Sequence, residues 1–266
     1  MDRGISVNFI IKNGLVQGYA FWESLKSCLA FASEVVVSDG FSTDGTFQYV
    51  EKFARMFSSR VPIQIYRDDW TTVNSPYGEV ISVISGINHR RCKYEWIYYL
   101  QADEVLPEDS VQFIRDIAEK HSDIYNSVWF PFCHFLSGWE PSPKGKAAYD
   151  EAIRMVKNRS DITFLGDAWS FTGATEPSCP ANQCPKPIYH LGGVFPKSRD
   201  QKAVGHGRIY TGLGDYQRLA QAAAERLARG DYASGCVKPD GLQGYPSCLD
   251  RLFGMVEYSP PSEAMD

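Results

Sequence analysis

Residues 34–46 decide the fold expected for this chain, and they read EVVVSDGFSTDGT. The valines are β-branched and apolar, which favours a buried strand. The run passes directly into Asp39 and a turn of small residues, in which Gly40 and Gly45 tolerate unusual backbone angles. Ser, Thr and Asp side chains in such a turn cap helices, so a helix is expected over 47–57. The segment is therefore predicted to be one strand–turn–helix unit.

The same alternation extends on both sides of this unit. Strands are expected at 5–11, 34–38, 61–66 and 96–100. Helices are expected at 21–32, 47–57, 79–92 and 107–120. Connections of this length join parallel strands. Residues 1–124 are thus predicted to form an α/β half with a mostly parallel sheet flanked by helices.

The pattern is less regular after residue 125. Short strands are expected at 127–135, 152–157 and 162–165, and an alanine-rich helix at 216–229. Residues 172–187 contain four prolines and little periodicity. We expect one domain over 1–258 with a regular half at 1–124 and an irregular half at 125–258. Residues 259–266 are expected to form a flexible tail.

Composition excludes several classes of protein. The formal net charge of −5 argues against a general binder of nucleic-acid phosphates, and we expect no nucleic-acid partner. With 44% hydrophobic residues the chain is not disordered, and no apolar run reaches the roughly 18 residues of a transmembrane helix. The 15 Phe, 15 Tyr and 6 Trp suit either sugar stacking or an ordinary core. The first residues lead straight into a strand, so we expect no signal peptide.

Seven cysteines are an odd number and are spread along the chain, which favours reduced thiols and a cytoplasmic location. Cys179 and Cys184 lie close together in a proline-rich loop. They could form a local disulfide or begin a zinc site, although no second pair follows at a useful spacing.

Carboxylates follow three of the expected strands. Asp39 follows the second, Asp68 and Asp69 the third, and Asp103 and Glu104 the fourth. Ligands of open α/β sheets bind at the carboxyl ends of strands, so these acids are expected to converge on one crevice. Acids kept close together repel unless a cation neutralises them, and oxygen ligands suit Mg²⁺ or Mn²⁺. The alternative is that acids simply favour solvated loops.

The turn at 39–46 is not a Walker loop, and no GxGxxG follows the first strand, which disfavours a dinucleotide-binding domain. Four segments, at 10–13, 25–29, 34–46 and 95–104, resemble a family-two glycosyltransferase of the GT-A fold. The last, EWIYYLQADE, resembles the strand that carries the family's DxD motif. The most similar branch contains lipopolysaccharide-core and related surface-glycan transferases. The resemblance implies a Rossmann-like sheet, with a nucleotide-sugar-binding half at 1–124 and an acceptor-binding half at 125–258.

The resemblance also implies roles for individual residues. The nucleotide sugar would be bound by Asn13, Asp39, Asp44, Gln101, Ala102, Asp103, Glu104 and Lys202. Asp39 would contact the base with Asn13 beside it, and Asp44 would shape that pocket. Asp103 would bind the Mn²⁺ or Mg²⁺ that holds the donor diphosphate, with Glu104 beside the metal and the sugar.

Two positions depart from the family's pattern. The branch commonly reads DADE, but Gln101 stands at the first Asp. Gln can still accept a hydrogen bond from a ribose hydroxyl, but it adds no charge to attract a cation. Residues 78–82 also lack the basic residue and the Asn that the family often has there.

The acceptor half offers two candidate bases. Residues 171–177 resemble the segment in which this branch places a His-Glu pair, with Thr175 in place of the His. An inverting transferase needs a base beside the acceptor hydroxyl, and we expect Glu176 first and Asp167 second. For both, the alternative is a solvated loop carboxylate.

His190 follows a short apolar run and fits the late histidine that often completes the family's metal site. The alternative is a core or loop histidine. Lys197, Arg199, Lys202 and Arg208 could close over the diphosphate as a lid. Sugar stacking is expected first at three tryptophans in loop-like contexts, Trp70, Trp139 and Trp169.

We therefore expect a metal-dependent inverting glycosyltransferase of the hexosyltransferase type, acting in polysaccharide biosynthesis. Its donor would be a nucleotide diphosphate sugar, first a UDP-sugar, and its acceptor a glycan hydroxyl. One alternative is an inactive GT-A domain that binds glycans or partners, and Gln101 is the reason to consider it. A sugar-1-phosphate nucleotidyltransferase is less favoured, because residues 13–18 lack the basic residues of its signature.

Overall fold

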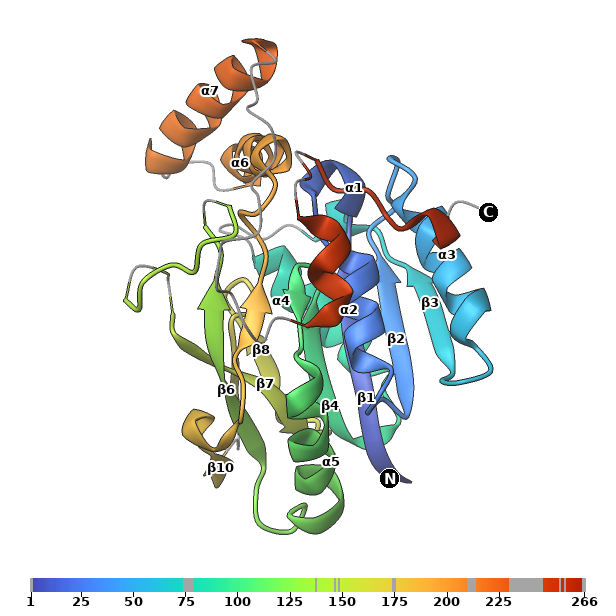
Figure 1. Ribbon diagram of the computed structural model, residues 1–266. Coiled ribbons are helices and arrows are strands. Elements are labelled where there is room, and N and C mark those ends of the chain that lie inside the picture. Colours follow the sequence, from blue (N-terminus) through green and yellow to red (C-terminus); the bar gives the residue numbers. More distant parts are fainter. Residues whose placement is uncertain are drawn as a thin grey trace.

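The computed structural model describes residues 2–73, 79–136, 138–145, 147, 149–173, 176–209, 214–229, 246–253, 255 and 257–264. Side chains are outside that description at 202, 205–209, 214–216, 247 and 248. Within the described residues the strands form a central sheet with helices on both faces (Figure 1). The α/β class expected from the sequence is confirmed.

The first half of the chain forms the parallel part of the sheet. Its strands are β1 (Asp2–Ile11), β2 (Glu34–Asp39), β3 (Ile63–Arg67) and β4 (Tyr94–Gln101). They lie in the order β3-β2-β1-β4, and each neighbouring pair is parallel. The register places the end of β1 between Asp39 on β2 and Gln101 on β4. The predicted carboxyl-end edge therefore exists.

The second half continues the same sheet in a mixed arrangement. Its strands are β6 (Ser127–His134), β7 (Glu151–Lys157), β10 (Ser178–Cys179) and β11 (Ile188–His190), and the short β5 (Glu104–Val105) of the first half joins them. After β4 the order is β7-β6-β11-β5, and β10 pairs with β6. Strands β8 (Thr163–Leu165) and β9 (Ser170–Thr172) pair separately. The register of β11 sets His190 opposite both His134 and Glu104.

The helices connect these strands. They are α1 (Gly14–Gln17), α2 (Phe21–Cys28), α3 (Thr46–Phe57), α4 (Glu79–His89), α5 (Val111–Lys120), α6 (Pro196–Ile209) and α7 (Gly214–Arg229). Short 3₁₀ helices lie at Trp70–Thr72, Glu108–Ser110, Ala181–Gln183, Ser247–Leu252 and Ser262–Ala264.

Three helices are shorter than the sequence predicts. Helix α2 ends at Cys28, because the Cys28 carbonyl accepts from both Phe31 and Ala32 as the chain turns into β2. Helix α4 ends at His89 in tight three-residue turns. The helix expected from 107 begins with a 3₁₀ turn, and its α-helical part starts at Val111.

Alternating side chains of the parallel strands build a core on each face of the sheet. Trp96, Tyr98 and Leu100 pack with the buried side chains of α2, α3 and α5. Ile97 and Tyr99 face the other way and pack with Phe164 and Phe171 of the β8–β9 pair. Tyr98 and Tyr99 are fully buried, and both contribute to the core.

The last described residues, 257–264, pack onto the domain. Tyr258 is buried and its hydroxyl donates to Glu23 of α2, and Ala264 is also buried. Figure 1 shows this segment passing α1 to reach α3. None of the helices in the described ranges has the length and apolar character needed to cross a bilayer.

Candidate active site

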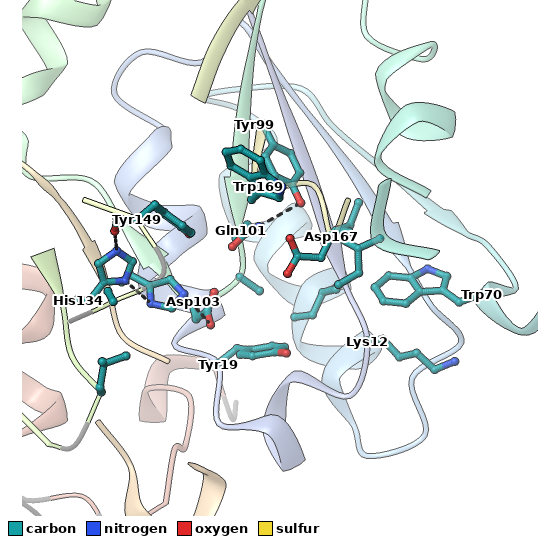
Figure 2. Close-up of a pocket in the computed structure, with 17 residues that line it drawn as sticks. Lys12, Tyr19, Trp70, Tyr99, Gln101, Asp103, His134, Tyr149, Asp167 and Trp169 are labelled. Atoms are coloured by element: carbon teal, nitrogen blue, oxygen red, sulfur yellow. Dashed lines mark hydrogen bonds and ion pairs between the residues drawn. The ribbon is translucent and has the colours of Figure 1, made fainter. Parts of the chain in front are cut away.

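A cavity of about 300 Å³ opens at the carboxyl ends of β1 and β4. Its polar lining residues come from both halves of the chain, and they are Lys12, Gln101, Asp103, His134, Asp167 and His190. Its aromatic walls are Tyr19, Trp70, Tyr99, Tyr149 and Trp169. Figure 2 shows these side chains gathered around one hollow. The edge predicted to bind a ligand therefore carries the cavity.

Asp103 and His190 meet at the end of the β4 strand. His190 Nε2 lies 3.5 Å from Asp103 Oδ2, and the Leu191 backbone N–H donates to the Asp103 carbonyl. Asp103 is 5% exposed. The pairing of β11 with β5 and β6 creates this juxtaposition, since it brings residue 190 beside residue 104. The two residues expected to bind metal are thus neighbours.

Glu104 points away from the cavity into the protein interior. Its carboxylate accepts from Nε and Nη2 of Arg154, with distances of 2.7 to 3.1 Å, and both side chains are fully buried. Burial raises the pKa of Glu104, and the Arg154 guanidinium opposes that shift. Glu104 therefore does not line the site beside the expected metal and sugar. Asp103 is the member of the pair that the cavity presents.

Gln101 and Ala102 complete the lining at the end of β4. The Gln101 amide donates to the Tyr99 hydroxyl at 3.4 Å. Ala102 is buried and has no polar side chain, so it contributes shape only. Both residues expected from the motif therefore lie at the cavity.

Asp39 is fully buried at the end of β2 and does not line the cavity. Its Oδ2 accepts from the Ser42 N–H at 3.0 Å and from Arg67 Nε at 3.3 Å. Its Oδ1 has no hydrogen-bond partner among the described residues. The Arg67 guanidinium lies over the rings of Phe41 and Phe47, 4.5 and 4.4 Å from their centroids. Asp39 therefore has one buried oxygen without a hydrogen-bond partner among the described residues, and Arg67 donates to its other oxygen.

Asn13 and Asp44 hold two loops together next to Asp39. Asn13 Oδ1 accepts from the Thr43 N–H at 2.8 Å, and Asp44 Oδ2 accepts from the Val16 N–H at 2.9 Å. Asp44 Oδ1 also accepts from the Thr46 N–H, which opens α3. Neither residue lines the cavity. Their contacts fix the backbone of the turn around Asp39.

The two candidate bases lie at opposite ends of the sheet. Asp167, in the loop between β8 and β9, lines the cavity, and Figure 2 shows its carboxylate directed inward. Glu176 lies just before β10, which pairs with Ser127 at the start of β6. His134 is at the other end of this eight-residue strand, about 23 Å away at 3.3 Å per residue. The Glu176 carboxylate is exposed and accepts from Ser178.

Glu176 is therefore not positioned as the first-choice base. β10 pairs with the start of β6, and the residue types at 171–177 do not predict this pairing. Thr175, expected to replace the family's histidine, lies outside the described residues.

The three tryptophans have different surroundings. Trp70 and Trp169 line the cavity, and Trp169 is 41% exposed. Trp139 is buried against Phe135, Phe195 and Phe253, so the stacking role expected for it is wrong.

The four basic residues expected to form a lid all lie on α6. Lys197 pairs with Glu257 at 2.6 Å. The backbone at 202 and 208 is helical, but the side chains of Lys202 and Arg208 lie outside the described part of the chain.

Sequence reasoning assigned no role to four residues of this region, which are Lys12, His134, Tyr149 and Arg154. Lys12 and His134 stand at or just after the carboxyl ends of predicted strands, and that rule could have found both. Arg154 is a lone charge inside an apolar strand, which signals a buried ion pair. Tyr149 has no such signal.

The described residues contain no group of three or more His, Cys, Asp or Glu side chains arranged to hold a metal ion. Asp103 and His190 still fit a divalent cation that a ligand helps to bind. Their facing atoms are 3.5 Å apart, and an ion at ~2.1 Å from each ligand atom can contact both. Mg²⁺ commonly uses one or two carboxylates and completes its shell with water and substrate phosphates.

The cysteines also bear on metal and disulfide chemistry. Cys179 and Cys184 are both free thiols, so neither forms the local disulfide considered from the sequence. The Cys179 thiol faces Gln183, and the Cys184 thiol faces Ser110 and the Lys186 carbonyl. Burial raises the pKa of Cys179 to about 11, which opposes thiolate formation.

No protein-family model matches the sequence, and no curated protein matches it. A comparison with solved structures finds matches that cover most of this chain. S. aureus TarS 1-349 in complex with UDP has a TM-score of 0.47 and 14% identity, with 85% of this chain and 71% of that chain covered. The mannosyltransferase PcManGT from Pyrobaculum calidifontis, in complex with GDP-Man and Mn²⁺, has a TM-score of 0.41 and 12% identity, with 88% and 77% covered. At this level of identity, the functional evidence lies in the cavity of this chain itself.

Proposed function

We propose that this protein is a metal-dependent, inverting glycosyltransferase of the hexosyltransferase type, acting in polysaccharide biosynthesis. One observation carries the proposal, namely that Asp103, His190 and Asp167 share one cavity at the carboxyl ends of the parallel strands. Two of the four segments that resemble the GT-A family, 10–13 and 95–104, contribute lining residues to this cavity. The donor is a nucleotide diphosphate sugar, and the acceptor is a glycan hydroxyl.

The donor side of the site is built on β1, β2 and β4. Asp103 and His190 would hold the Mn²⁺ or Mg²⁺, which neutralises the charge that develops on the diphosphate leaving group. Gln101 accepts a hydrogen bond from a ribose hydroxyl. Asp39 supports base recognition, because its buried Oδ1 lacks a partner within the described residues and buried acceptors rarely remain so. Asn13 and Asp44 fix the loops around it.

The acceptor side of the site contains Asp167. Its carboxylate takes the proton from the attacking hydroxyl, and a single direct displacement inverts the sugar's anomeric carbon. Trp169 and Trp70 line the same cavity and offer faces on which a sugar ring can stack. Lys202 remains a candidate contact to the diphosphate through α6.

The proposed location is the cytoplasm, where nucleotide sugars and reduced thiols occur together. The five cysteines whose side chains are described are all free. Burial also raises the pKa of the Cys28 thiol to about 12, which disfavours the reactive thiolate at neutral pH.

A glycan- or partner-binding module without catalysis is the second candidate, and two observations favour it. Gln101 removes one carboxylate from the motif, and Arg154 neutralises Glu104. One carboxylate of the QADE segment, Asp103, then faces the cavity. Such a module would bind ligands in the cavity without turnover.

A nucleotide-sugar panel separates the two candidates. Purified protein is incubated with UDP- and GDP-sugars, with and without Mn²⁺, and release of nucleoside diphosphate is measured. The transferase predicts slow metal-dependent hydrolysis of at least one donor, abolished in Asp103→Asn and retained in Glu176→Gln, a carboxylate far from the cavity. A binding module predicts no release from any donor.

A further inference from the structure

Another cavity, of about 680 Å³, lies at the opposite end of β1 from the candidate active site. Residues 3–5 contribute to its lining, whereas residues 10–12 at the other end of the strand contribute to the active-site cavity. About five residues separate these two segments, which corresponds to about 17 Å along the strand. Figure 1 marks the N-terminus at one end of β1 and α1 at the other. Among the described residues, none lines both cavities.

Three arginines from separate elements line this second cavity. Arg3 is on β1, Arg60 lies between α3 and β3, and Arg115 is on α5. All three are exposed, and Glu119 is the carboxylate beside them in the lining. Within the described ranges none of these arginines forms an ion pair with a carboxylate, whereas the buried Arg154 does. The cavity therefore has an excess of positive charge.

An irregularity in β1 lies directly beside Arg3. The pairing of β1 with β4 shifts register within residues 2–5, and Gly4 there has a φ of +145°. A Cβ at Gly4 would lie 2.5 Å from Ser33 Oγ and 2.7 Å from Tyr94 Cδ1, so the position requires glycine. Bulges of this kind change the direction of the neighbouring side chain. The backbone at the cavity is thus closely packed and specifically shaped.

A backbone carbonyl at the edge of the cavity orients Arg115. Its Nη2 donates to the Ala30 carbonyl in the loop between α2 and β2. This loop is fixed to β1, because the Ser33 N–H donates to the Ile5 carbonyl at 2.8 Å and the Ile5 N–H donates to Ser33 Oγ at 3.1 Å. A guanidinium has further N–H donors besides the one at Ala30, and these remain available to a ligand.

The chemistry of this cavity favours a phosphate group. Guanidinium groups bind carboxylates and phosphates through paired N–H···O hydrogen bonds. A carboxylate has its oxygens in one plane, whereas a phosphate presents oxygens in several directions, which suits arginines supplied by three different elements. We propose that this cavity is a binding site for a phosphate-bearing ligand, held by Arg3, Arg60 and Arg115. The inference does not rest on the proposed function, because no residue of the active-site cavity takes part.

Calorimetric titration with sodium pyrophosphate in metal-free buffer tests this site. We expect the wild type to bind, and Arg60→Gln and Arg115→Gln each to weaken binding about tenfold. Glu119→Gln is expected to strengthen binding, because it removes a negative charge from the lining. Arg90→Gln is the matched control, since this exposed arginine follows α4 on the other face of the sheet. Its affinity is expected to equal that of the wild type.

Vesicles distinguish a soluble ligand from a lipid headgroup. The same proteins are sedimented with phosphatidylcholine vesicles that contain or lack phosphatidic acid. Binding that needs phosphatidic acid and is lost in Arg60→Gln supports a phosphorylated lipid, whereas binding of pyrophosphate alone supports a soluble phosphate compound. Thermal unfolding of each variant without ligand first shows that lost binding is not lost folding. The proposal is overturned if the wild type binds neither probe, or if Arg90→Gln weakens binding as much as Arg60→Gln does.

Discussion

Carboxylates that look equivalent in the sequence differ in the structure, because each has different neighbouring side chains. Asp103 faces the cavity, whereas Glu104 is neutralised by Arg154. Hydrogen bonds from Arg91 hold the pKa of Asp68 below its usual range, with the Arg91 Nη1 to Asp68 Oδ2 distance at 2.7 Å. Asp69 accepts from the Thr71 N–H in the 3₁₀ turn that follows β3. The residues that partner each acid, more than the acids themselves, decide which carboxylate can do chemistry.

Asp167 and Glu176 give a direct comparison of the two candidate bases. Removing a general base typically costs on the order of 10² to 10⁴ in rate. We therefore expect Asp167→Asn to lower kcat by at least about 10²-fold while donor binding changes little. Steady-state kinetics with a productive donor and acceptor provide the measurement.

Glu176→Gln is the matched variant for this experiment, because its carboxylate is exposed at the far end of β6. It is expected to retain wild-type kcat. An inactive Glu176→Gln together with an active Asp167→Asn would contradict the position assigned to the base.

His89 makes stability depend on pH. It lies at the end of α4, where it is 6% exposed, and neither ring nitrogen has a hydrogen-bond partner in the described structure. Burial lowers the pKa of His89 from 6.5 to about 4. Between these values the unfolded chain binds the proton and the folded protein does not, so stability falls as pH drops from about 6.5 toward 4.

The full effect of this difference is about 3 kcal/mol. We expect His89→Leu to be more stable relative to wild type at pH 5 than at pH 7.5. Urea unfolding at both pH values measures the two differences. An identical difference at pH 5 and pH 7.5 would show that His89 does not titrate in this window.

At the scale of elements, the alternation of strands and helices in residues 1–124 could be predicted because each element carries its own periodicity. The same local pattern places Asp103 at a strand end, where ligands of such sheets bind. The position of Glu176 could not be predicted, since it depends on β10 pairing with Ser127, about 50 residues earlier in the chain. His190 lies at the same edge because its short strand, β11, pairs there with β5.

The buried Arg154–Glu104 pair joins β7 to β5, and breaking it is expected to destabilise the protein strongly. Arg154→Met leaves the Glu104 carboxylate buried without its partner, which typically costs about 3–5 kcal/mol. The double variant Arg154→Met, Glu104→Gln removes the charge and is expected to recover most of that loss. Chemical denaturation of the wild type, the two single variants and the double variant gives the coupling. Additive effects would contradict a shared buried pair.

At the scale of the whole molecule, the two halves share one continuous sheet, and the cavity takes residues from both. The end of the chain adds a further connection, since Arg251 and Tyr258 both bond to Glu23 of α2. Both residues lie within the domain predicted over 1–258. Glu23 is 2% exposed, and burial raises its pKa.

This connection is expected to contribute to global stability. Tyr258→Phe removes the hydroxyl that donates to Glu23 and accepts from the Trp22 N–H, leaving two buried groups unsatisfied. We expect a loss of about 1–3 kcal/mol in the free energy of unfolding. Thermal and urea unfolding of Tyr258→Phe against Tyr125→Phe, a half-buried tyrosine elsewhere, provide the comparison. Equal stability of the two variants would contradict a role for the C-terminal segment in holding the domain together.

Calorimetric titration of UDP and GDP in the presence and absence of Mn²⁺ tests the central claim most directly. The account predicts that at least one nucleotide binds the wild type with an affinity that Mn²⁺ increases, and that Asp103→Asn loses this increase while Glu176→Gln keeps it. Nucleotide binding that is absent in the wild type, or that is indifferent to both Mn²⁺ and Asp103, would contradict it.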